Sequence, residues 1–167
     1  QSGIKEWFTT KRSYFGPQLE AIYGTKASSD GDTNWGDVPR AGLFGQVSWL
    51  ASFSGADGNI PTKRGKFVIE DLLCNVIPPP PAAAMLKPIP PPNSVNTTRE
   101  RFEAHGEDGC SKGCHDSMDP VGFAFENFNA IGQFQDTENG KPIDASGEIH
   151  VDVVEGAFNN ATDLGAT

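Results

Sequence analysis

Residues 110–120 read C-S-K-G-C-H-D-S-M-D-P, and the rest of the predicted fold is arranged around them. Two cysteines followed directly by a histidine are typical of c-type haem attachment, because the thiols add to the vinyl groups of a haem while the imidazole coordinates its iron. Cys110 and Cys114 have three residues between them, one more than in the usual C-x-x-C-H spacing. The pattern predicts one covalent haem c, attached at Cys110 and Cys114, with His115 as the proximal ligand.

Two other uses of these cysteines are open. Cys110, Cys114 and His115 could be three ligands of a zinc ion, but a structural zinc site has four protein ligands, and the remaining cysteine, Cys74, is remote in sequence. The two cysteines could instead form a small disulfide loop beside the histidine. Neither alternative explains why the histidine follows the second cysteine directly.

The composition indicates a globular protein that does not bind nucleic acid. The chain has 167 residues, enough for a buried core, and 37% of them are hydrophobic. Its 19 glycines and 13 prolines predict much irregular structure. The formal net charge of -9 argues against a nucleic-acid partner, because phosphates attract clustered Lys and Arg, and it favours a redox partner protein that is neutral or basic.

Hydropathy gives no direct sign of a membrane span or of export. No apolar run approaches the length of a span, so membrane association is expected only through a partner or a segment outside this sequence. The first residues, QSGIKEWF, lack the basic and apolar regions of a signal peptide. A periplasmic or extracellular location in a bacterium is therefore inferred from haem attachment, with any signal removed or lying upstream.

The first half of the chain predicts short helices separated by a polar loop over residues 25–37. Pro17 and Gly24 fit the start and the end of a short helix. Hydrophobic residues at helical spacing predict a buried helix over 41–53. A further helix is expected from Thr62, acting as its cap, to Asn75.

The helix predicted over 62–75 carries two kinds of residue of interest. Lys63, Arg64 and Lys66 lie near its start, where basic residues oppose the helix dipole; we interpret them as a solvated face, with a partner or a haem propionate as the alternative. Cys74 lies among apolar residues, which predicts that it is buried and takes no part in haem binding.

The second half combines a proline-rich segment, helices and a hairpin. Residues 78–92 contain eight prolines and predict an extended strap. The sequence T-T-R-E at 97–100 predicts a capping box that begins a helix through about His105. Asn139-Gly140 predicts the turn of a small β-hairpin.

A helix that leads into the cysteine motif, a turn containing proline and an aromatic helix over 121–131 resemble the order of elements in small class I cytochromes c. Asp119 and Pro120 fit the cap and first residue of that aromatic helix. The resemblance implies that the carbonyl of Pro120 accepts the N–H of the proximal histidine. The predicted fold class is mainly α: a class I cytochrome c-like helical haem domain with a long proline-rich strap and a small β-hairpin.

Several longer runs resemble planctomycete-type cytochrome c proteins, which are exported and built from successive domains. The runs are R-G-K-F-V-I-E-D-L-L-C-N-V-I-P-P-P-P (64–81), T-T-R-E-R-F-E-A-H (97–105), C-H-D-S-M-D-P-V-G-F-A-F-E-N-F-N-A-I-G (114–132), and two shorter ones at 39–44 and 137–148. The resemblance implies a division into 1–35, the tail of a preceding helical domain, 36–132, the haem domain, and 133–167, the start of a following domain. It also allows a disulfide between Cys74 and a segment outside this chain.

The sixth ligand of the haem iron is argued by elimination. The remaining candidates are His105, His150, Met85 and Met118, and Met118 is too close to His115 to reach the far face. In class I topology the distal ligand follows the aromatic helix, where this chain offers His150. We predict His150 as a metal ligand, with Met85 second and an open sixth site, or one filled by a group from outside the chain, third.

Two function hypotheses follow. The first is a c-type cytochrome that transfers electrons through one covalent haem, as a domain of a larger exported oxidoreductase. The second is a haem-free structural or carbohydrate-associated module with a Cys110–Cys114 disulfide. The sequence shows no recognisable Ser-His-Asp triad and no pair of carboxylates spaced for acid–base catalysis. Electron transfer is therefore favoured over catalysis by this chain.

Overall fold

The fold mixes short helices with short hairpins. The computed structural model describes residues 3–79, 88–106 and 109–167, without the side chains of 110–112 and 114. The helices are α1 (Glu6–Thr9), η1 (Pro17–Leu19), α2 (Glu20–Tyr23), η2 (Leu43–Gly45), α3 (Val47–Ser52), α4 (Pro61–Lys66), η3 (Phe67–Leu72), α5 (Thr98–Gly106), α6 (Gly109–Phe123) and α7 (Ala161–Ala166). The strands are β1 (Arg12–Tyr14), β2 (Asp32–Asn34), β3 (Ser54–Gly55), β4 (Gly58–Asn59), β5 (Thr137–Glu138), β6 (Lys141–Pro142), β7 (Gly147–Val151) and β8 (Val154–Phe158).

The predicted mainly α, class I cytochrome c-like fold is wrong. Helix accounts for 38% and strand for 17% of the structure. In the described part of the chain the strands pair as four antiparallel two-stranded sheets: β1–β2, β3–β4, β5–β6 and β7–β8. Strands β1 to β6 have only two or three residues each, which is too few for hydrophobic alternation to reveal them in the sequence.

Local turn and cap chemistry was predicted more accurately than the fold class. In the capping box of α5, Thr97 N donates to Glu100 Oε2 at 2.7 Å and Glu100 N donates to Thr97 Oγ1 at 3.2 Å, which confirms the prediction. The β5–β6 hairpin is also confirmed, and both its turn residues, Asn139 and Gly140, have the positive φ of a tight hairpin turn.

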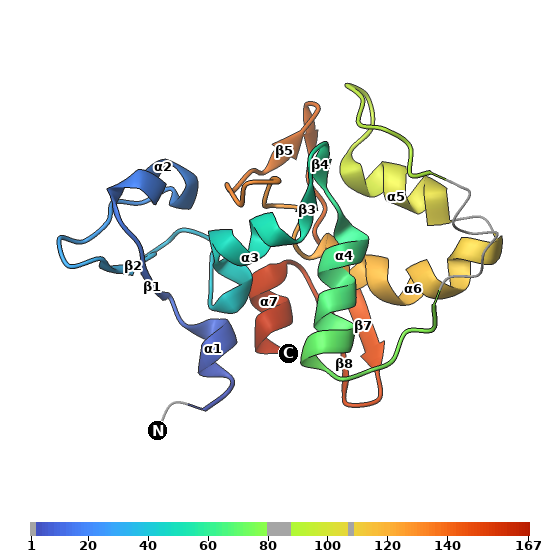
Figure 1. The fold of residues 1–167 in the computed structure, drawn as a ribbon, viewed down its shortest axis with the longest axis horizontal. Helices are drawn as coiled ribbons and strands as arrows, with labels where there is room; N and C mark the ends of the chain where they lie inside the picture. The colour runs from blue at the N-terminus through green and yellow to red at the C-terminus, as the bar shows by residue number, and fades with distance from the viewer. Residues whose placement is uncertain (1–2, 80–87, 107–108) are drawn as a thin grey trace.

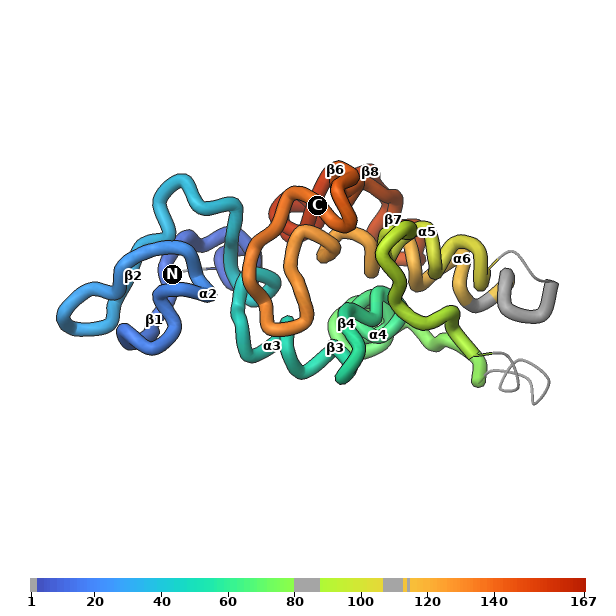
Figure 2. Tube along the Cα trace, turned by 90° about the horizontal axis from the view of Figure 1, so that it is seen from above, coloured from blue at the N-terminus to red at the C-terminus, as the bar shows by residue number. Residues whose placement is uncertain are grey.

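The molecule is elongated. The β1–β2 hairpin and α2 lie at one end, α5 and the start of α6 lie at the other, and α3, α4, α7, β7 and β8 lie between them (Figures 1 and 2). The main hydrophobic cluster is central and draws on both halves of the chain. Its buried residues are Phe44, Trp49, Leu50, Val68, Ile69, Met118, Val121, Ala124, Phe125, Phe128, Ile149, Phe158, Ala161 and Leu164.

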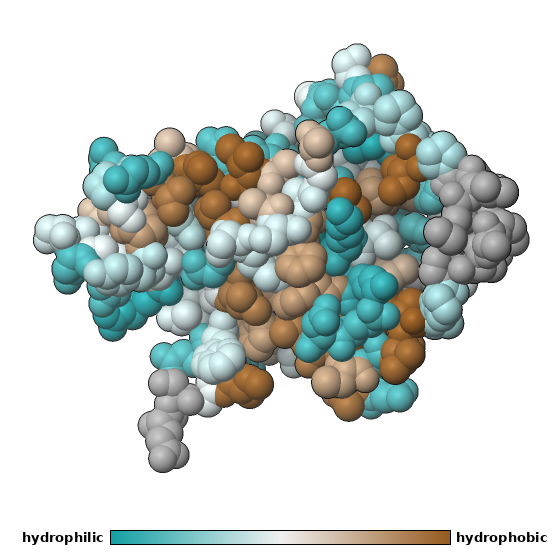
Figure 3. All heavy atoms as spheres, in the orientation of Figure 1, coloured by the Kyte–Doolittle hydropathy of each residue, from teal (hydrophilic) through white to brown (hydrophobic). Residues whose placement is uncertain are grey.

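Residues from β7, β8 and α7 therefore pack in the same cluster as residues from α3 and α6. A smaller cluster of Phe15, Tyr23 and Trp35 lies near the N-terminal end. The predicted domain boundaries at 35 and 132 stay predictions. Figure 3 shows hydrophobic residues reaching the surface in several separate areas of the face viewed.

Helices α4 and α6 pack backbone to backbone through two glycines. A Cβ atom on Gly65 would overlap the carbonyl of Met118, and a Cβ atom on Gly122 would overlap the carbonyl of Pro61. Only glycine permits so close an approach, because any side chain at either position would push the helices apart. This reciprocal contact fixes α6 against α4.

Helix α6 continues beyond the position where a new helix was expected. Asp119 and Pro120 do not begin a helix over 121–131; Pro120 lies inside α6, which ends at Phe123 and is followed by turns. The expectation was wrong because the Asp119 carboxylate is engaged by side chains, as described below, and does not cap backbone N–H groups.

The helix predicted over 62–75 begins at Pro61 and changes at Phe67 into the π-helix η3. Thr62 is therefore not its cap. Cys74 follows the helix with a φ of 54° and an exposed side chain, so the expected burial is wrong. The described part of the proline strap is held at its end, where the carbonyl of Pro90 accepts a hydrogen bond of 2.8 Å from Arg101.

Arg64 was interpreted as part of a solvated face, but its side chain is 0% exposed. Its guanidinium lies under the turns that follow α6, and burial lowers its pKa to about 10, so it stays charged at neutral pH. The acceptors of its hydrogen bonds are the carbonyls of Phe125 (2.9 Å), Phe128 (3.0 Å), Leu50 (3.3 Å) and Asn129 (3.3 Å), together with Ser54 Oγ (2.9 Å) and Asn59 Oδ1 (3.4 Å).

Arg40 is a second buried arginine that donates hydrogen bonds to backbone carbonyls, among them that of Gly132. Its side chain is also fully buried, donates to the carbonyls of Gly45 and Ile22 at 2.9 Å and to that of Gly132, and lies 4.8 Å from the centroid of the Phe128 ring. The segment from α6 to Gly132 is therefore held by two buried cations.

Replacing Arg64 by Met should lower the free energy of unfolding by about 3–5 kcal/mol, because several buried carbonyls would lose their donor. Chemical denaturation followed by circular dichroism measures the change. Arg12→Met is the matched control: Arg12 is exposed and pairs with Asp32 at the surface, so its loss should change the free energy of unfolding far less than Arg64→Met does. Equal effects of the two substitutions would contradict the proposed importance of Arg64.

Candidate functional site

A pocket of about 400 Å³ lies between α5 and α6, at the end of the molecule that carries the cysteine motif. Helix α5 contributes Arg99, Phe102, Glu103 and Gly106, and α6 contributes His115, Asp116, Asp119, Pro120 and Phe123. The wall is thus partly aromatic and partly charged. His115 is the histidine in this wall, and an imidazole can serve as a metal ligand or as a base.

The ring of His115 is held by a buried carboxylate. Its Nδ1 lies 2.8 Å from Asp119 Oδ2, one helical turn further along α6, and Thr62 Oγ1 on α4 donates to Asp119 Oδ1 at 2.6 Å. The Asp119 side chain is only 7% exposed. The hydrogen bond to Asp119 raises the pKa of His115, and burial opposes this only in part. Because Nδ1 contacts Asp119, Nε2 is the remaining ring nitrogen that could bind a ligand.

The ring of His105, near the end of α5, packs edge-on against the ring of His115, with 5.2 Å between the centroids. His105 is buried. Arg99 lies over the Phe123 ring at 4.7 Å and donates to the carbonyl of Ser146 at 2.7 Å, which ties α5 to α6 and to the start of β7. These contacts link the two helices that line the pocket.

Only some of the predicted site residues have side chains that the structure describes. Cys110 and Cys114 belong to the first two turns of α6, but their side chains lie outside the described residues, as does Met85. Pro120 lines the pocket, while its carbonyl faces Gly147 of β7. The acceptor at His115 Nδ1 is thus Asp119, the residue before Pro120.

His150 lies elsewhere, exposed on β7. Its Nε2 is 2.9 Å from Glu148 Oε2 and its Nδ1 is 3.3 Å from Glu155 Oε1. These carboxylates raise its pKa. The role of His150 as an iron ligand stays a prediction.

Asp119 and Thr62 are the members of this arrangement that sequence reasoning missed. The spacing of His115 and Asp119, four residues apart, would have placed them on one helix face had α6 been predicted to continue through Pro120. No comparable signal links Thr62 to Asp119, since they are 57 residues apart.

The residues around His115 fit a haem. Phe102, Pro120 and Phe123 give the wall the apolar side chains that a macrocycle packs against, and the Nδ1 contact fixes the ring of His115. Among the residues whose side chains are described, which do not include Cys110 and Cys114, no group of three or more His, Cys, Asp or Glu is arranged to hold a metal ion by itself.

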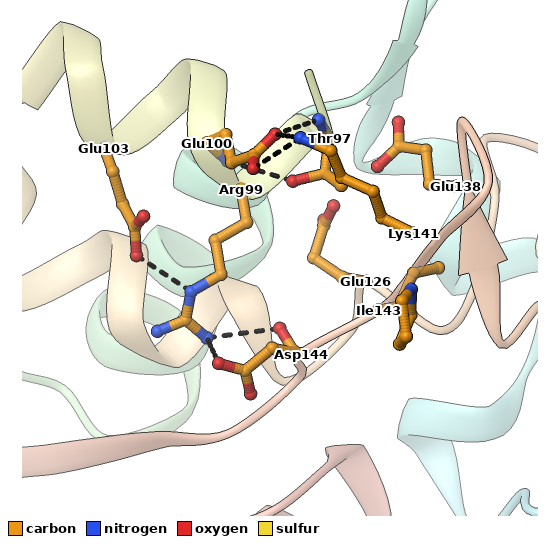
Figure 4. A pocket seen from close by; sticks show the side chains of 10 residues that line it. Thr97, Arg99, Glu100, Glu103, Glu126, Glu138, Lys141, Ile143 and Asp144 are labelled. Atoms are coloured by element: carbon orange, nitrogen blue, oxygen red, sulfur yellow. Dashed lines mark hydrogen bonds and ion pairs between the residues drawn. The ribbon is translucent and has the colours of Figure 1, made fainter. Parts of the chain in front are cut away.

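A second pocket, of about 290 Å³, adjoins the first and shares Arg99 and Glu103 with it. In Figure 4, Arg99 lies between Glu103 and Asp144, and Lys141 reaches Glu100. The cations of this pocket are therefore already paired. Glu126 lies at its inner wall, 2% exposed, and burial raises its pKa to about 8.

The fold and the site together define a protein of mixed helices and antiparallel hairpins with a histidine-bearing pocket between two helices. Residues 40–138, more than half of the chain, match the model of PSCyt3, a protein family of unknown function (DUF1588). The chain belongs to this family, a cytochrome-like family of planctomycete type. No curated protein and no solved structure matches the chain.

None of the helices that the structure describes is both long and apolar enough to span a membrane.

Replacing Glu126 by Gln should stabilise the protein at pH 8 by about 1–3 kcal/mol and leave it nearly unchanged at pH 4. Below the ordinary pKa of 4.5, both the folded and the unfolded protein carry the proton. Between pH 4.5 and 8 the unfolded chain releases it while the folded protein keeps it, so native stability falls as the pH rises, and the Gln variant escapes this loss.

Urea denaturation from pH 4 to pH 8 measures the difference between the two proteins. Glu103→Gln, at an exposed carboxylate of the same pocket, is the control and should show no such widening gap. A Glu126→Gln protein whose stability ran parallel to that of the wild type would show that Glu126 is ionised in the fold.

Proposed function

We propose that this chain is an electron-transfer domain with one haem c attached at Cys110 and Cys114 and with His115 as the proximal ligand. The observation that carries the proposal is the placement of His115. The histidine that directly follows Cys114 lines the pocket between α5 and α6, and its Nδ1 contacts a buried carboxylate. Ligating histidines typically have such a partner, because it fixes both the tautomer and the ring orientation.

Each wall of the pocket has a task in this function. A bound haem would supply a one-electron iron couple. Phe102 and Phe123 line the pocket with apolar side chains, and Asp119 contacts Nδ1 of His115 and so leaves Nε2 as the ring nitrogen for the iron. Arg99, which pairs with Glu103 and Asp144, holds the wall of the pocket together. Cys110 and Cys114 lie one helical turn apart on α6, so both residues lie on the same face of the helix.

The family name supports a cytochrome-like role. The net charge of -9 favours a redox partner with a neutral or basic docking surface. Attachment of haem to cysteines belongs with export, so we propose a periplasmic or extracellular location, as a domain of a larger oxidoreductase. His150 is our first candidate for the sixth ligand and Met85 our second, with an open site third.

Expression of the chain together with a bacterial haem-attachment system tests the proposal. The protein should gain the mass of one haem, retain it after acid-acetone extraction and give a low-spin spectrum. His115→Ala should abolish the low-spin spectrum, and Cys110→Ala or Cys114→Ala should leave one thioether bond or no bound haem. Intact-mass measurement and absorption spectroscopy provide these readouts.

Two substitutions act as controls. Cys74→Ser should leave haem attachment unchanged, because Cys74 lies outside the motif formed by Cys110, Cys114 and His115. His150→Ala should change the low-spin spectrum, because His150 is our first candidate for the sixth ligand, and an unchanged low-spin spectrum would overturn that choice. A folded protein with no added mass and with a Cys110–Cys114 disulfide would exclude the haem hypothesis and favour the haem-free module.

A further inference from the structure

Both carboxylate oxygens of Asp119 are engaged by residues of different helices. Oδ2 lies 2.8 Å from Nδ1 of His115 on α6, and Oδ1 accepts a 2.6 Å hydrogen bond from Thr62 Oγ1 on α4. The carboxylate is nearly buried. A hydrogen bond to a charged acceptor in such a setting is stronger than one to a neutral carbonyl.

The helix packing explains why this contact is fixed. Thr62 stands three residues before Gly65, and Asp119 stands three residues before Gly122. The glycines are the points where α4 and α6 touch backbone to backbone, against the carbonyls of Met118 and Pro61. The hydroxyl of Thr62 is therefore held at the carboxylate, and Asp119 has little freedom to turn away from His115.

The chemical consequence depends on which acceptor receives the histidine N–H. A carboxylate polarises the N–H bond more than a peptide carbonyl does, so the imidazole becomes more basic and donates more electron density to a bound metal. Stronger donation favours the oxidised, more positive iron. Hydrogen bonding by groups around the ligand is one of the levers by which a protein sets a haem potential.

We propose that Asp119 is a positioning residue that acts through His115 and lowers the reduction potential of the haem. The inference rests on the proposed function and adds the direction in which Asp119 shifts the reduction potential. The domain would then suit electron transfer at low potential. Thr62 supports Asp119 in this role by holding its second oxygen.

The test is a redox titration of the haem-loaded protein and of its Asp119→Asn variant. Asparagine keeps the shape and can still accept a hydrogen bond, but it removes the charge. At a fixed ambient potential near the wild-type midpoint, the ratio of reduced to oxidised haem should rise about tenfold, a shift of about 59 mV for a one-electron couple.

Asp116→Asn is the matched control. Asp116 lines the same pocket, and its charge acts on His115 from a distance, but the carboxylate in contact with Nδ1 of His115 is that of Asp119. Removing an equal charge there should move the ratio much less than Asp119→Asn does. Equal shifts in the two variants, or no shift in Asp119→Asn, would overturn the role of Asp119 while leaving the haem assignment intact.

A measurement on the unaltered protein covers the case in which Asp119→Asn does not fold. In the diamagnetic ferrous low-spin protein, the Nδ1 proton of His115 should show a nuclear Overhauser contact with the Cβ protons of Asp119. The absence of this contact in a folded, haem-loaded protein would overturn the inference. A protein that carries no covalent haem would overturn the proposed function, and the inference with it.

Discussion

The fold depends on a buried guanidinium. Arg64 has no exposed surface, and it holds the carbonyls of the turns after α6 to the end of α3. An ion without water needs several well-placed acceptors, and peptide carbonyls that leave a helix end supply them. The aromatic residues Phe125 and Phe128 belong to those same turns, so the cation also determines how the main hydrophobic cluster is closed. Burial raises the pKa of Glu126, and the charge of Arg64 offsets this effect only in part.

The same helix packing that brings Arg64 under these turns also builds the candidate site. Gly65 follows Arg64 directly and lies against α6, and Gly122 completes the contact from the other side. One turn away from this contact, Thr62 meets Asp119, and Asp119 meets His115. The orientation of His115 therefore depends on how α4 and α6 pack against each other. A functional group on the surface of α6 is set by backbone contacts between two helices, which is more precise than a site carried by a loop.

Sequence reasoning succeeded where a few neighbouring residues decide the structure. The capping box at Thr97 and the tight turn at Asn139 follow from side-chain and backbone chemistry within four residues, and both are confirmed. It failed where distant residues compete. Asp119-Pro120 has the local pattern of a helix start, but Thr62, which is 57 residues away, engages the carboxylate, and α6 continues. Arg64 looked like a solvated cation for the same reason, because its acceptors lie up to 65 residues away.

By itself, the sequence determined the chemistry that is available: two cysteines, a histidine directly after them, a proline-rich segment and an acidic balance, with runs that resemble the family to which the chain belongs. Tertiary structure alone decided the fold class, the burial of Arg40 and Arg64, and the pairing of His115 with Asp119. The physical reason is that the sequence shows which groups are available to interact, whereas burial decides which of these groups need a hydrogen-bond or ion-pair partner. A buried charge or polar group has to find partners at any sequence distance, and only the packed helices show where those partners are.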